Sequence, residues 1–274
     1  MTMIETAIAI GLFAPLLAGL AILALPRKLS EPISGLATII TAIATFSLLP
    51  HVLAGKTVGW SVLKLMPGVE IAFKLDGLGM TFALLATGLW VIVNIYNSGY
   101  IRADHLKHTR RYLGAFAASI GSAVGIAFAG NLLTFLLFYE LLTLATYPLV
   151  VHKESTKAIN AGRRYLLFAL SGGLAVTAGS VWIWSLTGTL DFTPGGFMTG
   201  VAPMPTLLTI FGLLIAGCAV KAAIMPMHSW LPAAMVAPSP VSALLHAVAV
   251  VKAGVFGCMR MLGYVFGPES IGQT

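Results

Sequence analysis

Residues 131–151 read NLLTFLLFYELLTLATYPLVV, and Glu140 is the one charged residue among them. An apolar helix of about 20 residues spans a hydrocarbon core of roughly 30 Å, so this stretch predicts a membrane-spanning helix. A charged group near the bilayer centre costs about 2.5 to 3.5 kcal/mol on insertion scales. A sequence that keeps a carboxylate there indicates a functional or a pairing role for Glu140.

The composition extends this prediction to the whole chain. Of the 274 residues, 58% are hydrophobic and 9% are charged, whereas soluble domains carry about 25% charged residues. Eight apolar windows follow, at residues 4–25, 33–54, 77–101, 112–129, 131–151, 165–186, 206–225 and 241–264. We therefore expect an all-α polytopic membrane protein of about eight transmembrane helices without a soluble domain. The first window has no positive flank before it, which predicts a retained helix and not a cleaved signal.

The basic residues indicate how the chain crosses the membrane. Ten lie in the predicted odd-numbered loops: Arg27, Lys28, Arg102, Lys107, Arg110, Arg111, Lys153, Lys157, Arg163 and Arg164. Three lie in the second loop: Lys56, Lys64 and Lys74. Because cytoplasmic loops carry the excess of Lys and Arg, we expect cytoplasmic odd loops and an N-terminus outside. The net charge of +7 is thereby assigned to topology and lipid headgroups, and not to nucleic acid.

Four ionisable residues remain inside the predicted spans: Glu140, Lys221, His246 and Lys252. We expect Arg260 to extend from a helix end toward the interface, as long cationic side chains do. Ionisable groups within membrane helices mark ion or proton pathways by default. The alternative is that Glu140 and one lysine form a pair that only fixes helix packing. Such a pair would leave the other lysine and the histidine unexplained.

A proline break follows Lys221. Pro226 has no N–H, and its ring crowds the carbonyl of Ala222, so the seventh helix is expected to end just after Lys221. His228 lies within the same break. Irregular backbone at membrane depth is tolerated where it is buried in protein or lines a water-filled cavity. This favours a hydrated site, while an ordinary proline-rich turn between two spans explains the same residues equally well.

Other residues are expected to serve packing. Small residues recur on the fourth span (Ala115, Ser119, Ala123, Ala127) and on the sixth (Gly172, Ala175, Gly179), a pattern that permits close helix contact. Cys218 and Cys258 are expected to be packed as small hydrophobes. The histidines at span ends are expected at the interface: His51, His105, His108 and His152. The sequence holds no nucleotide-binding, nucleophile-elbow or metal-ligand motif, so we predict no cofactor, no metal and no catalytic site of its own.

Two stretches resemble a known family. The first, residues 221–256, reads KAAIMPMHSWLPAAMVAPSPVSALLHAVAVVKAGVF, and the second is residues 131–149 with Glu140. A weaker match, LDGLG at residues 75–79, opens the third span. All three are similar to the antiporter-like proton-translocating subunits. That superfamily includes membrane-arm subunits of respiratory complex I, membrane-bound hydrogenase subunits and subunits of multisubunit sodium/proton antiporters.

The resemblance implies roles for the four buried ionisable residues. In the family, the glutamate of the fifth helix pairs with the lysine of the broken seventh helix, and the eighth helix passes protons on. Carried over, these are Glu140, Lys221, and His246 with Lys252. The last two are six residues apart and so point about 120° apart on a helix. The sequence departs from the usual pattern at Tyr139, where Trp is common, and at Ala233, where an acidic residue is common.

The resemblance also implies an organisation. Residues 1–110 correspond to three leading helices, 111–264 to the first five-helix repeat with its proton half-channel, and 265–274 to a short tail. The family's unit has a second, inverted repeat, so this chain corresponds to the N-terminal half. It is expected to be a fragment, a split subunit completed by another polypeptide, or a reduced form. The expected partners are other membrane subunits, one of which supplies the second repeat.

Three functions are consistent with these residues. The first is proton translocation, or cation/proton exchange, within a multisubunit antiporter, a complex I-like dehydrogenase or a hydrogenase, so that the chain belongs to an oxidoreductase only through its complex. The second is a structural membrane-arm subunit without transport. The third is a subunit that energises inorganic-carbon uptake. Each places the chain in a bacterial or archaeal inner membrane or an equivalent energy-coupling membrane.

Overall fold

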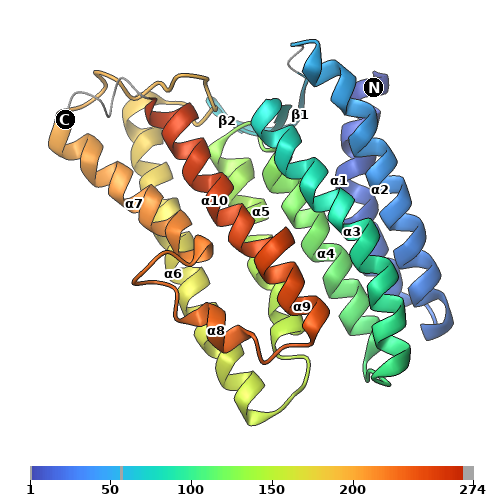
Figure 1. The fold of residues 1–274 in the computed structure, drawn as a ribbon. Helices are drawn as coiled ribbons and strands as arrows, with labels where there is room; N and C mark the ends of the chain where they lie inside the picture. The colour runs from blue at the N-terminus through green and yellow to red at the C-terminus, as the bar shows by residue number, and fades with distance from the viewer. Residues whose placement is uncertain (1, 56–57, 268–274) are drawn as a thin grey trace.

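Eight long helices run side by side and form the body of the molecule (Figure 1). The computed structural model describes residues 2–55 and 58–267, with the side chain of Val58 left out. Within these residues, eight helices are long and apolar enough to cross a membrane. They are α1 (Met3–Ala24), α2 (Ser30–Leu53), α3 (Gly77–Ala103), α4 (Thr109–Phe128), α5 (Leu132–Val150), α6 (Thr156–Thr187), α7 (Met204–Ala222) and the stretch Ser239–Phe266. The predicted windows are confirmed, with most ends within three residues.

The last of these spans is built from several pieces. They are α9 (Ser239–Ala243), η2 (Leu244–Val248), α10 (Val250–Arg260) and η3 (Met261–Phe266), of which η2 and η3 are π-helical. The short helix α8 (Trp230–Ala234) lies between α7 and α9, and the turn η1 (Arg27–Leu29) joins α1 to α2. A π-helical turn inserts an extra residue into the helical repeat and is frequent at functional sites.

The helices pack as two groups that share one boundary. The first group is α1, α2, α3 and α4, in which α4 contacts each of the other three, and the second is α5, α6, α7 and α10. Helices α4 and α5 join the two groups, and α4 is the most buried of the spans. Its small residues allow this, because Gly114 and Gly121 lie directly against Gly19 and Leu16 of α1. The residues predicted for close packing, Ala115, Ser119, Ala123 and Ala127, are all buried, while the close contact with α1 is made by glycines that the prediction did not name.

The sixth span also packs as predicted and is longer than predicted. A Cβ on Gly172 would lie 2.8 Å from the carbonyl oxygen of Gly217 in α7, so the two backbones are in direct contact. Helix α6 begins at Thr156, nine residues before the predicted window, because Ser155 caps it by accepting a hydrogen bond from the Ala158 N–H. The exposed Arg163 and Arg164 are thus helical residues and not loop residues.

A β-hairpin absent from the prediction connects α2 to α3. Strands β1 (Val58–Met66) and β2 (Val69–Leu75) pair antiparallel around a Pro67–Gly68 turn, in which Gly68 has a φ of +75°. The hairpin lies at the same end of the bundle as the N-terminus (Figure 1). It is held to the start of α5, since Asn131 Nδ2 donates to the Glu70 carbonyl at 2.7 Å and Ala72 N–H to Thr134 Oγ1 at 3.0 Å.

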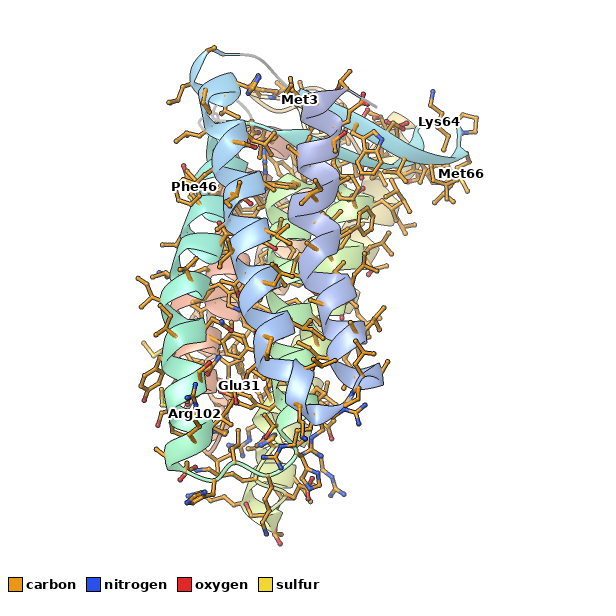
Figure 2. All side chains as sticks on the ribbon, turned by 90° about the vertical axis from the view of Figure 1, so that its right-hand side faces the viewer. Met3, Glu31, Phe46, Lys64, Met66 and Arg102 are labelled. Atoms are coloured by element: carbon orange, nitrogen blue, oxygen red, sulfur yellow. The ribbon has the colours of Figure 1, made fainter. Side chains whose placement is uncertain are left out.

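The outer surface of the bundle is apolar along most of its length. Figure 2 looks onto α1 and α2, with the hairpin extending to the right from beside the upper end of α1. Leu17, Leu20, Leu36 and Ile43 on these two helices are all more than half exposed. Large apolar surfaces of this kind mark contact with lipid or with other membrane chains. Lys56, one of the predicted loop charges, lies outside the described residues, as does the predicted tail from residue 268.

Candidate functional site

Lys221 lies at the point where α7 ends inside the bundle. The helix stops at Ala222, and the next residue, Ala223, has a left-handed φ of +55°. The predicted end just after Lys221 is therefore confirmed, several residues before the cis Met225–Pro226 bond. The Lys221 side chain is 1% exposed. The carbonyl end of a helix carries partial negative charge, which favours a cation at this position.

The ammonium of Lys221 is held by α5. Its Nζ donates a hydrogen bond to the Tyr139 carbonyl and lies 3.3 Å from the centroid of the Tyr139 ring. The Tyr139 hydroxyl in turn donates to the Gly217 carbonyl of α7 at 3.1 Å. Tyr139 therefore both binds the cation and fixes α5 against the helix that carries it, a role that the sequence did not reveal.

Glu140 directly follows Tyr139, the residue that binds Lys221, but its side chain lies against α6. Its carboxylate lies against Gly173 of α6, where a Cβ would be 2.7 Å from Glu140 Cδ and 3.2 Å from Oε2. Its Oε1 is buried without a hydrogen-bond partner. The resemblance implied that Glu140 and Lys221 form a pair. Among the described residues no salt bridge joins them, and Lys221 instead binds the carbonyl of Tyr139, the residue before Glu140.

His246 and Lys252 lie on different faces of the last span. His246 is half-buried in the π-helical turn η2, and its Nε2 is buried without a partner. Lys252, expected inside the membrane body from the sequence, is exposed on α10. Two residues further on, α10 lies against α7, because a Cβ on Gly254 would be 2.7 Å from the Lys221 carbonyl carbon. Helix α10 therefore touches the backbone of Lys221 while its own lysine faces outward.

The break after α7 is open on one side. Pro226 and His228 are not buried, and Met225 is 77% exposed. On the inner side, Trp230 of α8 is 1% exposed and its Nε1 donates to the Val220 carbonyl at 2.7 Å. The same carbonyl accepts from the Ala223 N–H at 3.1 Å, so two donors meet it where α7 ends. The break is therefore anchored to the bundle at Trp230 and uncovered at Pro226.

Arg260 corrects one prediction. It does not extend to the interface but is 1% exposed, and its guanidinium forms two hydrogen bonds with the Asp76 carboxylate. Asp76 also caps α3 by accepting from the Gly79 N–H at 2.8 Å. Three aromatic rings surround the guanidinium carbon at 4.4 to 5.3 Å: Phe192, Phe256 and Tyr264. The sequence feature that could have indicated this partner for Arg260 is Asp76 within the LDGLG stretch.

The surroundings of two side chains, Asp76 and His152, lower the pKa of each. Burial raises the pKa of Asp76, but the Arg260 guanidinium, the Gly79 N–H and Tyr264 together outweigh it and hold that pKa below its ordinary value. His152 was expected at the interface and is instead 5% exposed, with its ring 5.2 Å from that of Tyr112. Burial, together with the nearby Arg111, lowers the pKa of His152.

The fold and these helix breaks define a class of protein, the antiporter-like integral membrane subunits. Residues 129–272 match the family model described as NADH:quinone oxidoreductase/Mrp antiporter, transmembrane. This match covers more than half of the chain, including α5 and the segment from Lys221 to Lys252. The chain therefore belongs to the NADH:quinone oxidoreductase/Mrp antiporter transmembrane family.

Several curated proteins are similar over most of this chain. It is 29% identical over 242 residues to a probable K⁺/H⁺ antiporter subunit of Rhizobium meliloti, covering 86% of this chain and 24% of that protein. It is 33% identical over 202 residues to an Na⁺/H⁺ antiporter subunit of Alkalihalophilus pseudofirmus, covering 71% of this chain and 24% of that one. The chain thus spans about a quarter of the length of these relatives.

Two solved structures share the fold. The Mrp complex from Dietzia sp. DQ12-45-1b matches with a TM-score of 0.79 and 26% identity, covering 93% of this chain and 27% of that one. An archaeal respiratory membrane complex, the membrane-bound sulfane sulfur reductase, matches with a TM-score of 0.80 and 21% identity, covering 93% and 52%. The second likeness concerns the fold alone.

Proposed function

We propose that this chain translocates protons across the membrane, in exchange for a cation, as one subunit of a multisubunit complex. The observation that carries the proposal is the buried ammonium of Lys221, at the end of a broken helix and bound to the residue of α5 that precedes Glu140. Ionisable groups inside membrane helices are expensive to keep and mark proton relays. The relatives named as K⁺/H⁺ and Na⁺/H⁺ antiporter subunits support the same class of function.

The proposed switch is the position of the Glu140 carboxylate. Lys221 is held by neutral groups, namely a carbonyl, an aromatic ring and a helix end. If the carboxylate turns from Gly173 toward Lys221, its charge stabilises the protonated lysine, and its return removes that stabilisation. The proton then passes to His246 and Lys252 of the last span. In this scheme residues 111–264 act as one proton half-channel and residues 1–110 as its leading helices.

The exposed break at Pro226 is an argument for a partner subunit that completes the pathway. Exposed irregular backbone at membrane depth occurs only where other protein or a water-filled cavity covers it. The break at Pro226 meets this condition only in an assembly, and Lys252, exposed on α10, is costly to leave in lipid. We propose that another membrane subunit supplies the second repeat on this side. The charged loops support the proposed orientation, with the N-terminus outside and the odd loops cytoplasmic, in a bacterial or archaeal inner membrane.

The test is transport in vesicles that contain the whole complex, followed as cation-dependent or redox-driven proton movement. We expect Glu140→Gln and Lys221→Ala each to abolish this movement, because each removes one charge of the proposed switch. Lys64→Ala on the exposed hairpin serves as the control and should retain transport. Assembly of each variant complex is checked by affinity purification.

Normal transport in both variants, with assembly intact, would refute the proposal. Loss of assembly in both, with no transport defect in complexes that do form, would instead favour a structural membrane-arm role.

A further inference from the structure

A basic cavity lies where α1 ends and α4 begins, on elements that carry neither Glu140 nor Lys221. Its volume is about 450 Å³, and six residues line it: Leu23, Arg27, His108, Thr109, Arg110 and Arg111. Three of the six are arginines and none is acidic. The cavity lies at the end of the bundle opposite Met3, which is the end where Figure 2 shows Glu31 and Arg102. This lining is suited to an anion.

The positive charge of the cavity is only partly balanced by the protein. Arg111 forms an ion pair with Glu154, in which Nη1 lies 2.6 Å from Oε1. Arg110 donates instead to two neutral groups, both backbone carbonyls in the last turn of α1. In the part of the chain that the structure describes, neither Arg110 nor the exposed Arg27 forms an ion pair. Two of the three guanidinium charges therefore remain available to an anion.

The start of α4 adds to the positive potential of the cavity. The first N–H groups of a helix lack partners within the helix, and this end carries partial positive charge. His108, the residue that precedes α4, provides no side-chain cap for them, and the Thr109 hydroxyl donates to the Leu106 carbonyl at 3.1 Å. Arginine is enriched where phosphate is bound, because its planar guanidinium donates two parallel hydrogen bonds. A phosphate group is therefore the anion that this lining fits.

An apolar surface continues from the cavity along α1. Leu23 lines the cavity and is 48% exposed, and Leu20 and Leu17 before it are 65% and 61% exposed. The step from Leu17 to Leu23 is about 9 Å along a helix. Because α1 ends at Ala24, the leucines belong to the membrane-spanning part and the arginines lie at its end. A ligand with an anionic head and an apolar tail contacts both, whereas a free ion or an acidic peptide contacts only the cavity.

We propose that this cavity binds the phosphate headgroup of an anionic phospholipid, with an acyl chain along Leu17, Leu20 and Leu23 of α1. Basic pockets between membrane helices bind such headgroups. The proposed orientation places this end on the cytoplasmic side, where the leaflet carries anionic lipids. The site uses none of the residues of the proposed proton pathway.

The test is photo-crosslinking of lipid to the intact complex in phosphatidylcholine vesicles. The probe is phosphatidylglycerol with a diazirine near the top of one acyl chain, and the matched probe is phosphatidylcholine with the same chain. Mass spectrometry quantifies the probe attached to residues 17–23. We expect phosphatidylglycerol to label this segment roughly tenfold more than phosphatidylcholine, the factor of one hydrogen bond to a charged group. Equal labelling would indicate ordinary contact with bulk lipid, and no labelling would indicate that another subunit covers the cavity; either result would overturn the proposal.

Two neighbouring residues test whether the cavity selects the lipid. Arg27→Gln removes a guanidinium that lines the cavity, so labelling by phosphatidylglycerol should fall by roughly tenfold. Lys28→Gln removes the same charge from the same exposed turn, but Lys28 does not line the cavity, so most of the labelling should remain. An equal loss in both variants would show a general attraction to the surface and refute the site.

Inorganic phosphate distinguishes a bound lipid from a free ion. Added at an ionic strength matched with chloride, it should leave the labelling unchanged, because it lacks the acyl chain that contacts α1. Displacement of the lipid probe would assign the cavity to free phosphate and overturn the lipid site. None of these measurements depends on transport, so failure here is distinguishable from failure of the proposed function.

Discussion

At the scale of single residues, Gly173 determines where the Glu140 carboxylate can lie. The absence of a Cβ leaves the space in α6 that the carboxylate fills, and any larger residue would overlap Glu140 Cδ at 2.7 Å. Tyr139, one residue earlier, holds Lys221 through its carbonyl and ring. Two adjacent residues of α5 thus serve two different neighbours, one on α6 and one on α7.

Gly173→Ala should therefore impair transport more than folding. Overpacking costs about 1 to 3 kcal/mol, and Glu140 relieves it by turning away from α6. We expect transport to fall by about tenfold, the factor that corresponds to about 1.4 kcal/mol. The measurement is proton movement in vesicles at matched amounts of complex. Gly212→Ala on α7 meets open space and is the control; an equal effect of both substitutions would contradict this role of Gly173.

At the scale of elements, the Asp76–Arg260 pair fastens α10 to the start of α3. The residues are 184 apart in sequence, and one end of the pair caps α3 while the other is enclosed by aromatic rings of α10, its π-helical extension and the loop before α7. Helix α10 carries Lys252 and follows the turn that carries His246. The pair therefore fixes the position of the helix on which the proposed relay ends.

Asp76→Asn should destabilise the protein while keeping the cap on α3. Removing one partner of a buried ion pair costs about 3 to 5 kcal/mol, because the other charge remains buried. Asp76 has its pKa lowered from 3.8, so its stabilising contribution is complete above that pH and is lost as the pH falls through the folded-state value.

Thermal unfolding in nanodiscs checks this prediction. The melting temperature of Asp76→Asn should lie well below that of the unaltered protein at neutral pH, and the difference should shrink once the pH is lowered past the pKa of Asp76. Asp191→Asn, a mostly exposed carboxylate near the same end, is the matched control. A difference that stays constant across this pH range would show that the charge of Asp76 contributes nothing to stability.

At the scale of the whole molecule, two exposed features of the bundle are unsuited to lipid. Lys252 on α10 and the break at Pro226 are exposed, whereas most exposed side chains along α1 and α2 are apolar. A lysine facing hydrocarbon is costly. These exposed features predict that a second membrane chain covers them.

Cross-linking within the complex tests this surface. In a background with Cys218→Ala and Cys258→Ala, we expect Lys252→Cys to form a short thiol-to-amine cross-link to another membrane subunit. Leu167→Cys, on the exposed apolar face of α6 and 70% exposed, should form none under the same conditions. Cross-linking from position 167 but not from 252 would place the partner on the wrong side for this proposal.

The sequence predicted the elements better than their contacts. The eight spans and the end of α7 after Lys221 followed from hydropathy and from Pro226, because both act within one stretch of chain. The hairpin was missed because its alternation is short and it is held by contacts to Asn131 and Thr134, far along the chain. The start of α6 was missed because its charged first turns continue beyond the apolar window.

What the sequence alone determined is the membrane architecture, the family and the few ionisable residues that the spans contain, since each depends on composition or on local order. What only the tertiary structure decided is which of these residues meet. Lys221 lies on the Tyr139 carbonyl while Glu140 faces Gly173, Arg260 is paired with Asp76, and Lys252 faces outward. The physical reason is that rotation and crossing of helices follow from side chains packing across the whole bundle, which no single stretch of sequence contains.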